Sequence, residues 1–108
     1  MSTASDTPVL DTLAAMTVDS IERCGLPPDM LILTRIAALA ASDAPPLSYA
    51  AHIDPALETG VTAEQLQDVL VAIAPIVGTA RVMTAAANIA TALGIAIAVA
   101  DADISARG

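Results

Sequence analysis

Residues that could act in acid–base chemistry are few in this sequence, and two of them lie three positions apart. His52 is the only histidine of the chain, and Tyr49 is its only tyrosine. If residues 46–53 are helical, Ser48 and Tyr49 precede His52 by four and three positions and can share its face. Histidine is the side chain whose ordinary pKa suits proton transfer near neutral pH. The segment therefore predicts either a general acid or base with hydroxyl groups beside it, or a histidine that is hydrogen-bonded for structural reasons.

Two arginines occupy positions where a guanidinium needs a compensating partner. Arg35 lies inside an apolar segment, and burial of its charge requires a carboxylate or several carbonyl oxygens as partners. Arg81 is expected in the first turn of a helix, where a cation opposes the helix macrodipole at a cost of about 0.3–1 kcal/mol. Each predicts an ion pair or a bound anionic ligand, because arginine binds carboxylates through two hydrogen bonds. The acids considered for an ion pair are Asp43, Asp54, Glu58 and Glu64 for Arg35, and an acid of a second subunit for Arg81.

Other catalytic arrangements have little support in the sequence. Cys24 is the only cysteine, so a disulfide within the chain and a paired-cysteine redox motif are excluded. A second histidine and a dense acidic cluster at ligand spacing are both missing, so a metal site is not expected. The glycines Gly60, Gly78 and Gly94 are isolated and do not form a phosphate-binding loop. We therefore expect neither a metal nor a cofactor.

The first half of the chain contains two helical patterns that would lead up to these residues. Residues 9–25 carry apolar side chains on one helical face. After a pair of prolines, Asp29 can cap a second helix over residues 30–42. This second helix is apolar nearly all round, so we expect it at the centre of the fold.

The second half begins with the His52 segment. Pro55 follows Asp54, which predicts a junction between two short helices at this point. Thr62 and Gln65 then form the pattern of a capping box at the start of a helix. We expect that helix to end at Pro75 and Gly78, and a long last helix to run from Thr79 to about Asp101.

Composition favours one all-α domain. The chain has 108 residues, of which 56% are hydrophobic and 1% aromatic. Small side chains such as alanine let helices pack closely, whereas sheets are richer in β-branched and aromatic residues. We predict a single domain over 1–108, with an N-terminal helix and connector (1–28), a helical core (29–101) and a C-terminal tail (102–108). A small, apolar chain of this kind is expected to gain stability as a homo-oligomer.

Charge excludes several classes of partner. Twelve acids against four arginines give a net charge of −8. Nucleic-acid binding needs a basic surface and usually aromatic stacking residues, and an acidic chain is repelled by anionic lipid. The first residues lack the basic and apolar regions of a signal peptide, so we expect a cytoplasmic protein.

A membrane helix over residues 82–100 is the alternative that the sequence leaves open. These residues carry no charge and approach the length of a membrane span. Thr84, Asn88 and Thr91, however, form a polar stripe on one helical face, and the usual flanking aromatic and basic residues are missing. We therefore expect a helix buried in an oligomer core, in which the stripe forms a polar seam between subunits or the wall of a pocket, and no membrane association.

The order of motifs between residues 35 and 93 resembles that of a known family. Arg35 near the start of an apolar helix is followed by His52, by "AL", by "GVT" and by "EQLQDVL", and an alanine-rich helix begins after Gly78. This pattern is similar to that of the carboxymuconolactone decarboxylase family, to which alkylhydroperoxidase D-like proteins also belong. The resemblance implies the alkylhydroperoxidase D-like all-α fold with about five to six helices, homo-oligomers that are commonly trimers or hexamers, and pockets near subunit interfaces. It also matches His52 to the histidine of the family.

Two departures from the family pattern limit the chemistry. The peroxidase branch resembles CxxCxxxH, but Pro45 and Ser48 stand at the two cysteine positions before His52. Thiol peroxidase chemistry is therefore excluded, because no thiolate is there to attack a peroxide. Pro55 after the histidine departs from the decarboxylase branch and puts that branch's own substrate in doubt.

The resulting functional hypothesis is a lyase or isomerase that acts by proton transfer on a small carboxylate or lactone. His52 would be the general acid or base and Tyr49 an orienting hydroxyl. Arg35 or Arg81 would bind the carboxylate, with Ser48 also contacting the substrate. The alternative is a non-catalytic homo-oligomeric binding or scaffold protein in which His52 is a structural residue of the core.

Overall fold

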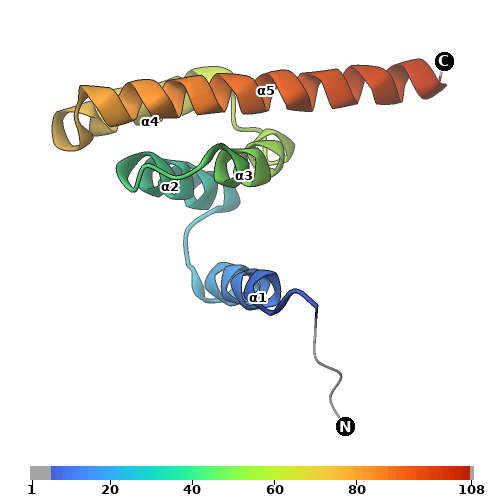
Figure 1. Cartoon of the computed structure of the whole chain (residues 1–108), viewed down its shortest axis with the longest axis horizontal. Coiled ribbons are helices and arrows are strands. Elements are labelled where there is room, and N and C mark those ends of the chain that lie inside the picture. Colours follow the sequence, from blue (N-terminus) through green and yellow to red (C-terminus); the bar gives the residue numbers. More distant parts are fainter. Residues whose placement is uncertain (1–5, 108) are drawn as a thin grey trace, which may run out of the picture.

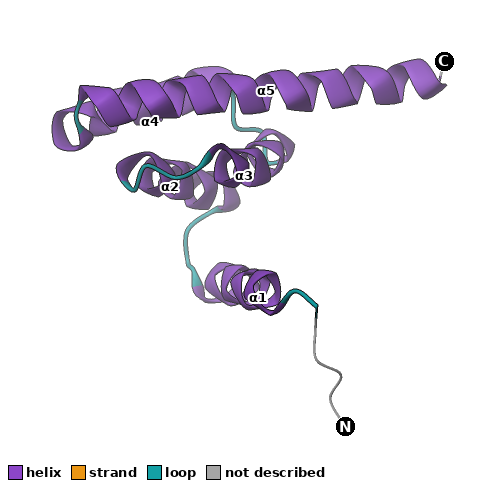
Figure 2. Cartoon of the chain, in the orientation of Figure 1, coloured by secondary structure: helices purple, strands orange, loops and turns teal. Residues whose placement is uncertain are grey.

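A computed structural model describes the backbone of residues 6–107 and the side chains up to Gly94; within that range all regular secondary structure is helical, and loops join the helices (Figures 1 and 2). The predicted all-α class is confirmed. The five helices are α1 (Pro8–Arg23), α2 (Pro28–Ala41), α3 (Pro46–Glu58), α4 (Ala63–Val77) and α5 (Thr79–Arg107).

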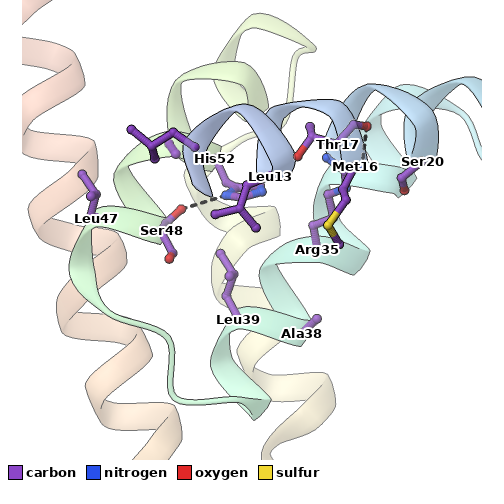
Figure 3. Close-up of a pocket in the computed structure, with 12 residues that line it drawn as sticks. Leu13, Met16, Thr17, Ser20, Arg35, Ala38, Leu39, Leu47, Ser48 and His52 are labelled. Carbon is purple, nitrogen blue, oxygen red and sulfur yellow. Dashed lines mark hydrogen bonds between the residues drawn. The ribbon is translucent and has the colours of Figure 1, made fainter. Parts of the chain in front are cut away.

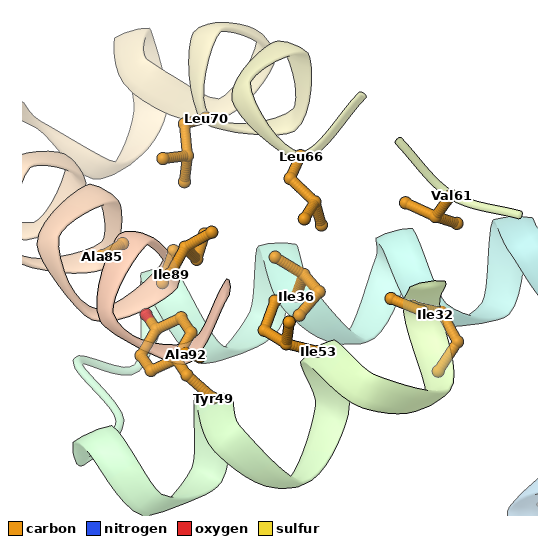
Figure 4. Close-up of a cluster of buried hydrophobic side chains, with 12 residues drawn as sticks. Ile32, Ile36, Tyr49, Ile53, Val61, Leu66, Leu70, Ala85, Ile89 and Ala92 are labelled. Atoms are coloured by element: carbon orange, nitrogen blue, oxygen red, sulfur yellow. The ribbon is translucent and has the colours of Figure 1, made fainter. Parts of the chain in front are cut away.

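Helix α2 lies at the centre and packs against α3, α4 and α5. Its residues Ile32, Ile36 and Ala40 are buried at a spacing of four, which places them on one face of the helix. They meet buried side chains of the three surrounding helices in one cluster (Figure 4). The prediction that this helix is central is therefore confirmed. The other members of the cluster are Tyr49, Ile53, Ala56, Val61, Leu66, Leu70, Ala85, Ile89 and Ala92.

Helix α1 stands apart from the other four helices (Figure 1). None of its residues is buried, and each of its large apolar side chains is at least 50% exposed. An isolated helix of 16 residues is marginally stable in water, so most of its stability must come from packing. The apolar face predicted for this segment is present, but within this chain it is largely unpacked.

The turns on either side of α3 are built by the same backbone motif. At the end of α2, Asp43 has φ 54° and its N–H donates to the Ala40 carbonyl, while the Ala44 N–H donates to the Leu39 carbonyl. At the end of α3, Gly60 has φ 88° and forms the equivalent bond to Leu57, and Val61 bonds to Ala56. Both are Schellman motifs, which require a left-handed residue just after the helix.

Two prolines that were predicted to interrupt helices lie inside them. Pro55 is within α3 and Pro75 is within α4, so the expected junction beside His52 is absent. Helix α4 passes through Pro75 and ends at Val77 with Gly78 as its C-cap, which confirms the predicted end at Gly78. Each proline lacks the N–H that would bond to the carbonyl four residues earlier. Those carbonyls belong to Ala51 and Val71, both exposed residues, so water can bind them instead.

The other helix ends were predicted from residues close together in the sequence, and most of them are correct. The Thr62 hydroxyl accepts a hydrogen bond from the Gln65 N–H at 3.1 Å, and the Thr62 N–H donates to Gln65 Oε1 at 2.9 Å. The predicted capping box is therefore confirmed. Asp29 lies in the first turn of α2 rather than at its cap, and α5 continues beyond Asp101 to Arg107.

Residues 82–100, considered above as a membrane span, form part of α5. Over the described range, no helix combines the length and the hydropathy that crossing a membrane would require.

Tyr49 is the largest of the fully buried side chains and lies on the core side of α3, together with Ile53 and Ala56 (Figure 4). Burial of the phenol, and then the nearby charge of Asp43, raise the pKa of Tyr49 above its ordinary value. Tyr49 is 1% exposed and is a member of the hydrophobic cluster. Tyr49 therefore acts in this structure as an apolar core residue.

The helix-end motif predicts opposite effects for the same substitution at two glycines. Gly60→Ala is expected to lower the free energy of unfolding by about 1–2 kcal/mol, because alanine is strained at positive φ. Gly94→Ala, inside α5, is expected to raise it by about 0.5–1 kcal/mol. At both positions an added Cβ would meet no atom within 4 Å, so only the backbone differs. Urea unfolding followed by circular dichroism measures both, and shifts of the same sign would contradict the motif.

The raised pKa of Tyr49 predicts a loss of stability in alkaline solution. The unfolded chain releases the phenol proton first, so deprotonation favours unfolding as pH rises above about 10. Tyr49→Phe removes this proton. We therefore expect wild type and Tyr49→Phe to have similar melting temperatures at neutral pH and wild type to fall below the variant at alkaline pH. Parallel melting curves across this pH range would contradict the prediction.

Candidate functional site

A pocket of about 550 Å³ lies between α1 and the pair formed by α2 and α3 (Figure 3). Helix α1 forms one wall, and α2 and α3 form the other. The pocket contains three residues that the sequence singled out, Arg35, Ser48 and His52. The remaining lining residues are Leu10, Leu13, Met16, Thr17, Ser20, Ala38, Leu39, Leu47 and Ala51.

The hydrogen bond of His52 defines which ring nitrogen can exchange protons. His52 Nδ1 lies 2.7 Å from the backbone carbonyl oxygen of Ser48, one helical turn earlier in α3. A carbonyl oxygen only accepts, so Nδ1 carries the hydrogen in this bond. The described residues provide no partner for Nε2. Neutral His52 can therefore accept a proton at Nε2, and protonated His52 can donate one there.

Helix α3 holds His52 in place by burying its opposite face. Tyr49, Ile53 and Ala56 point into the core, whereas Ser48 and His52 are half-buried and line the pocket. Ser48, four residues before His52, therefore shares a helical face with it, as predicted. Tyr49, three residues before His52, faces the core and does not line the pocket.

Arg35 is half-buried on α2 and has few partners. Its Nη2 donates to the Thr17 carbonyl oxygen of α1 over 3.4 Å, which is a long hydrogen bond. The predicted ion pair with an acid of the chain is not observed, since the one ion pair among the described side chains joins Arg23 and Asp19. The guanidinium therefore has N–H groups available for an anion in the pocket.

The charge of the pocket is opposite to that of the chain. The lining includes no aspartate or glutamate, and Arg35 is its one permanently charged residue. The protein as a whole carries a net charge of −8. A local positive charge in such a chain favours a negatively charged ligand at this point.

Arg81 lies in the first turn of α5, as predicted. Its Nη1 donates to the carbonyl oxygen of Ala41 at 2.6 Å, at the C-terminal end of α2. A cation there is stabilised by the macrodipole of α2, which offsets its unfavourable place at the start of α5. Within the chain, the partner of Arg81 is thus a backbone carbonyl. Arg81 does not line the pocket.

Sequence reasoning missed the wall that α1 contributes. Leu13, Met16 and Thr17 recur at helical spacing, and that periodicity predicted one apolar face of this helix. In the structure these side chains line the pocket across from Arg35 and His52 (Figure 3). Periodicity identifies a face but does not show whether a side chain or a ligand covers it.

A second, smaller hollow of about 270 Å³ lies between α3 and α5. Asn88 and Thr91 of the predicted polar stripe border it, together with Pro46, Leu47 and Ala50.

Among the side chains that the structure describes, no three potential metal ligands converge.

Comparison with known proteins identifies the family. The model of the carboxymuconolactone decarboxylase family matches residues 8–92, from the start of α1 into α5. No curated protein and no solved structure matched the chain. The match covers most of the sequence and includes Arg35, Ser48 and His52. The chain therefore belongs to the carboxymuconolactone decarboxylase family.

Proposed function

We propose that this protein is a lyase or isomerase that acts by proton transfer on a small carboxylate or lactone. The observation that carries the proposal is one pocket that contains both an anion-binding guanidinium and a histidine with an available Nε2. Membership of the family alone would not specify the reaction, because related chains can perform different chemistry.

Arg35 binds the negative charge of the substrate in this proposal. The carboxylate replaces the long hydrogen bond to Thr17 and pairs with the guanidinium through two shorter bonds. The half-buried position of Arg35 strengthens the interaction, because it is less screened than an ion pair in water.

His52 transfers the proton. For a β-keto acid, the bond between the carboxylate carbon and its neighbour breaks, CO₂ leaves, and the electron pair moves to the ketone oxygen as an enolate. Protonated His52 then donates its Nε2 proton to the carbon that lost CO₂. For an unsaturated lactone, neutral Nε2 instead removes a proton from the carbon next to the carbonyl, and the protonated ring returns it to another carbon of the conjugated enolate, which moves the double bond. Ser48 lies beside His52 and contacts the substrate, whereas Tyr49 has no direct part.

Thiol chemistry has no support in the pocket. Pro45 and Ser48 stand where the peroxidase branch carries cysteines, and Cys24 does not line the pocket. Proton transfer requires neither an oxidant nor a reductant, so a proton-transfer reaction needs no thiol here.

The proposal includes a homo-oligomer, a trimer or hexamer as the family resemblance implies. Its support is the apolar surface outside the pocket, where Val71, Ile76 and Met83 are 71%, 88% and 67% exposed. Large apolar side chains that are exposed in a single chain can be buried in an interface between chains.

A non-catalytic binding protein is the second candidate. The observation that favours it is the His52–Ser48 hydrogen bond, which by itself gives the histidine a structural partner. In that case Arg35 would bind an anion without turnover. The two candidates differ only in whether Nε2 exchanges a proton with the ligand.

The His52→Gln variant separates the two candidates. Glutamine can still donate a hydrogen bond but cannot transfer a proton near neutral pH. We expect CO₂ release from a panel of small β-keto acids to fall at least about 100-fold relative to wild type. Tyr49→Phe is the control and is expected to retain activity, because Tyr49 lies outside the pocket. Equal turnover by His52→Gln and wild type would refute the proton-transfer proposal.

The assembly is tested by Ile76→Asp. Ile76 is 88% exposed, so the substitution costs nothing in the packing of a single chain but places a charge in an apolar interface. We expect light scattering to give a smaller assembly for the variant than for wild type, with unchanged helicity. Glu64→Asp, an exposed acidic position on the same helix, serves as the control.

A further inference from the structure

The pocket is larger than a small carboxylate needs. Its volume of about 550 Å³ corresponds to roughly 18 water molecules at about 30 Å³ each. Arg35, Ser48 and His52 occupy the α2–α3 side. The rest of the lining is mainly aliphatic, which a compact polar substrate would leave uncovered.

The aliphatic side chains of the pocket come from two helices that face each other across it. Leu13 and Met16 belong to α1, and Leu39 belongs to α2 (Figure 3). Leu13 remains 51% exposed and Met16 61% exposed, although both turn toward the rest of the protein. The apolar side chains on the two sides therefore do not bury one another.

A single long hydrogen bond joins this wall to the cation. Within the described range, the bond from Arg35 to the Thr17 carbonyl is the one hydrogen bond that links α1 to another helix. An anion that binds Arg35 competes with this bond. Any molecule that displaces it must hold α1 in another way, and apolar contact with Leu13 and Met16 would do so.

We propose that the ligand of this pocket is an amphipathic monocarboxylate, with a carboxylate that binds Arg35 and an aliphatic body of several carbons that packs between Leu13, Met16 and Leu39. The ligand supplies the apolar contacts that are missing between α1 and the core. A positively charged head group is disfavoured by Arg35, and no acid in the lining would bind it. This inference rests on the proposed function and adds the class of substrate.

The proposal is tested by isothermal titration of the full chain with acetate, butanoate, hexanoate and octanoate, kept below micelle-forming concentrations. We expect affinity to rise about fourfold for each added methylene until the pocket is filled. Octanol and octylamine have the same chain with a neutral or positive head. Both are expected to bind at least about tenfold more weakly than octanoate. Equal affinity for acetate and octanoate, or for octanoate and octylamine, would overturn the proposal.

Matched variants separate the two parts of the ligand. Leu13→Ser should flatten the dependence on chain length and leave acetate binding unchanged. Val18→Ser is its control, because Val18 is 54% exposed on the same helix but does not line the pocket. Both residues are exposed, so neither substitution removes core packing. An equal loss of octanoate affinity in the two variants would indicate non-specific apolar binding and would contradict the proposal.

Arg35→Gln tests the head group in the same way. We expect its affinity for octanoate to fall to that for octanol, while Arg23→Gln on α1 retains wild-type affinity. Arg23 is highly exposed and lies outside the pocket. Unchanged octanoate binding by Arg35→Gln would overturn the assignment of the carboxylate to this guanidinium.

The outcome can be distinguished from that of the catalytic proposal. Octanoate binding with the expected chain-length dependence, together with no His52-dependent turnover of any β-keto acid or lactone, would support this inference and refute catalysis. Turnover that depends on His52, without any dependence of binding on chain length, would refute this inference alone.

Discussion

The structure depends on the burial of α2, which packs against α3, α4 and α5. Its inward face, Ile32, Ile36 and Ala40, is formed by residues four apart, so all three reach the same cluster. Arg35 is next to Ile36 in sequence but points to another side of the helix. The central helix of the fold thus holds the cation of the pocket, and the guanidinium needs no partner in the core.

Helix α3, like α2, has one face in the core and another face at the pocket. One face buries Tyr49 and Ile53, and the other presents His52 to the pocket. The helix lies between two Schellman turns, at Asp43 and Gly60, that determine where the chain enters and leaves it. The buried face of α3 and the Schellman turns at its two ends fix the position of the His52 backbone. A proton-transfer group must be held in position in this way.

Helix α1 lacks comparable support. Its apolar residues are exposed and a single long hydrogen bond from Arg35 reaches its backbone. Because α1 has so few contacts, a ligand bound in the pocket is expected to change its position or its stability. The physical link between ligand and structure is therefore expected at α1 rather than in the core, where packing is dense.

Local signals in the sequence determined the helical class, the central position of α2 and the Thr62–Gln65 capping box, because each depends on residues only three or four positions apart. They also identified Arg35, Ser48 and His52, which share one pocket. Only the tertiary structure decided that Tyr49 belongs to the core, that Arg81 binds the end of α2 and that α1 forms the other wall of the pocket. The pattern of one helix shows which residues share a face, but the element that meets this face depends on how separate helices pack. The sequence shows that Pro55 and Pro75 each remove a helical hydrogen bond. It does not show that the carbonyl left without a partner is exposed to water, because that exposure depends on how the helices pack.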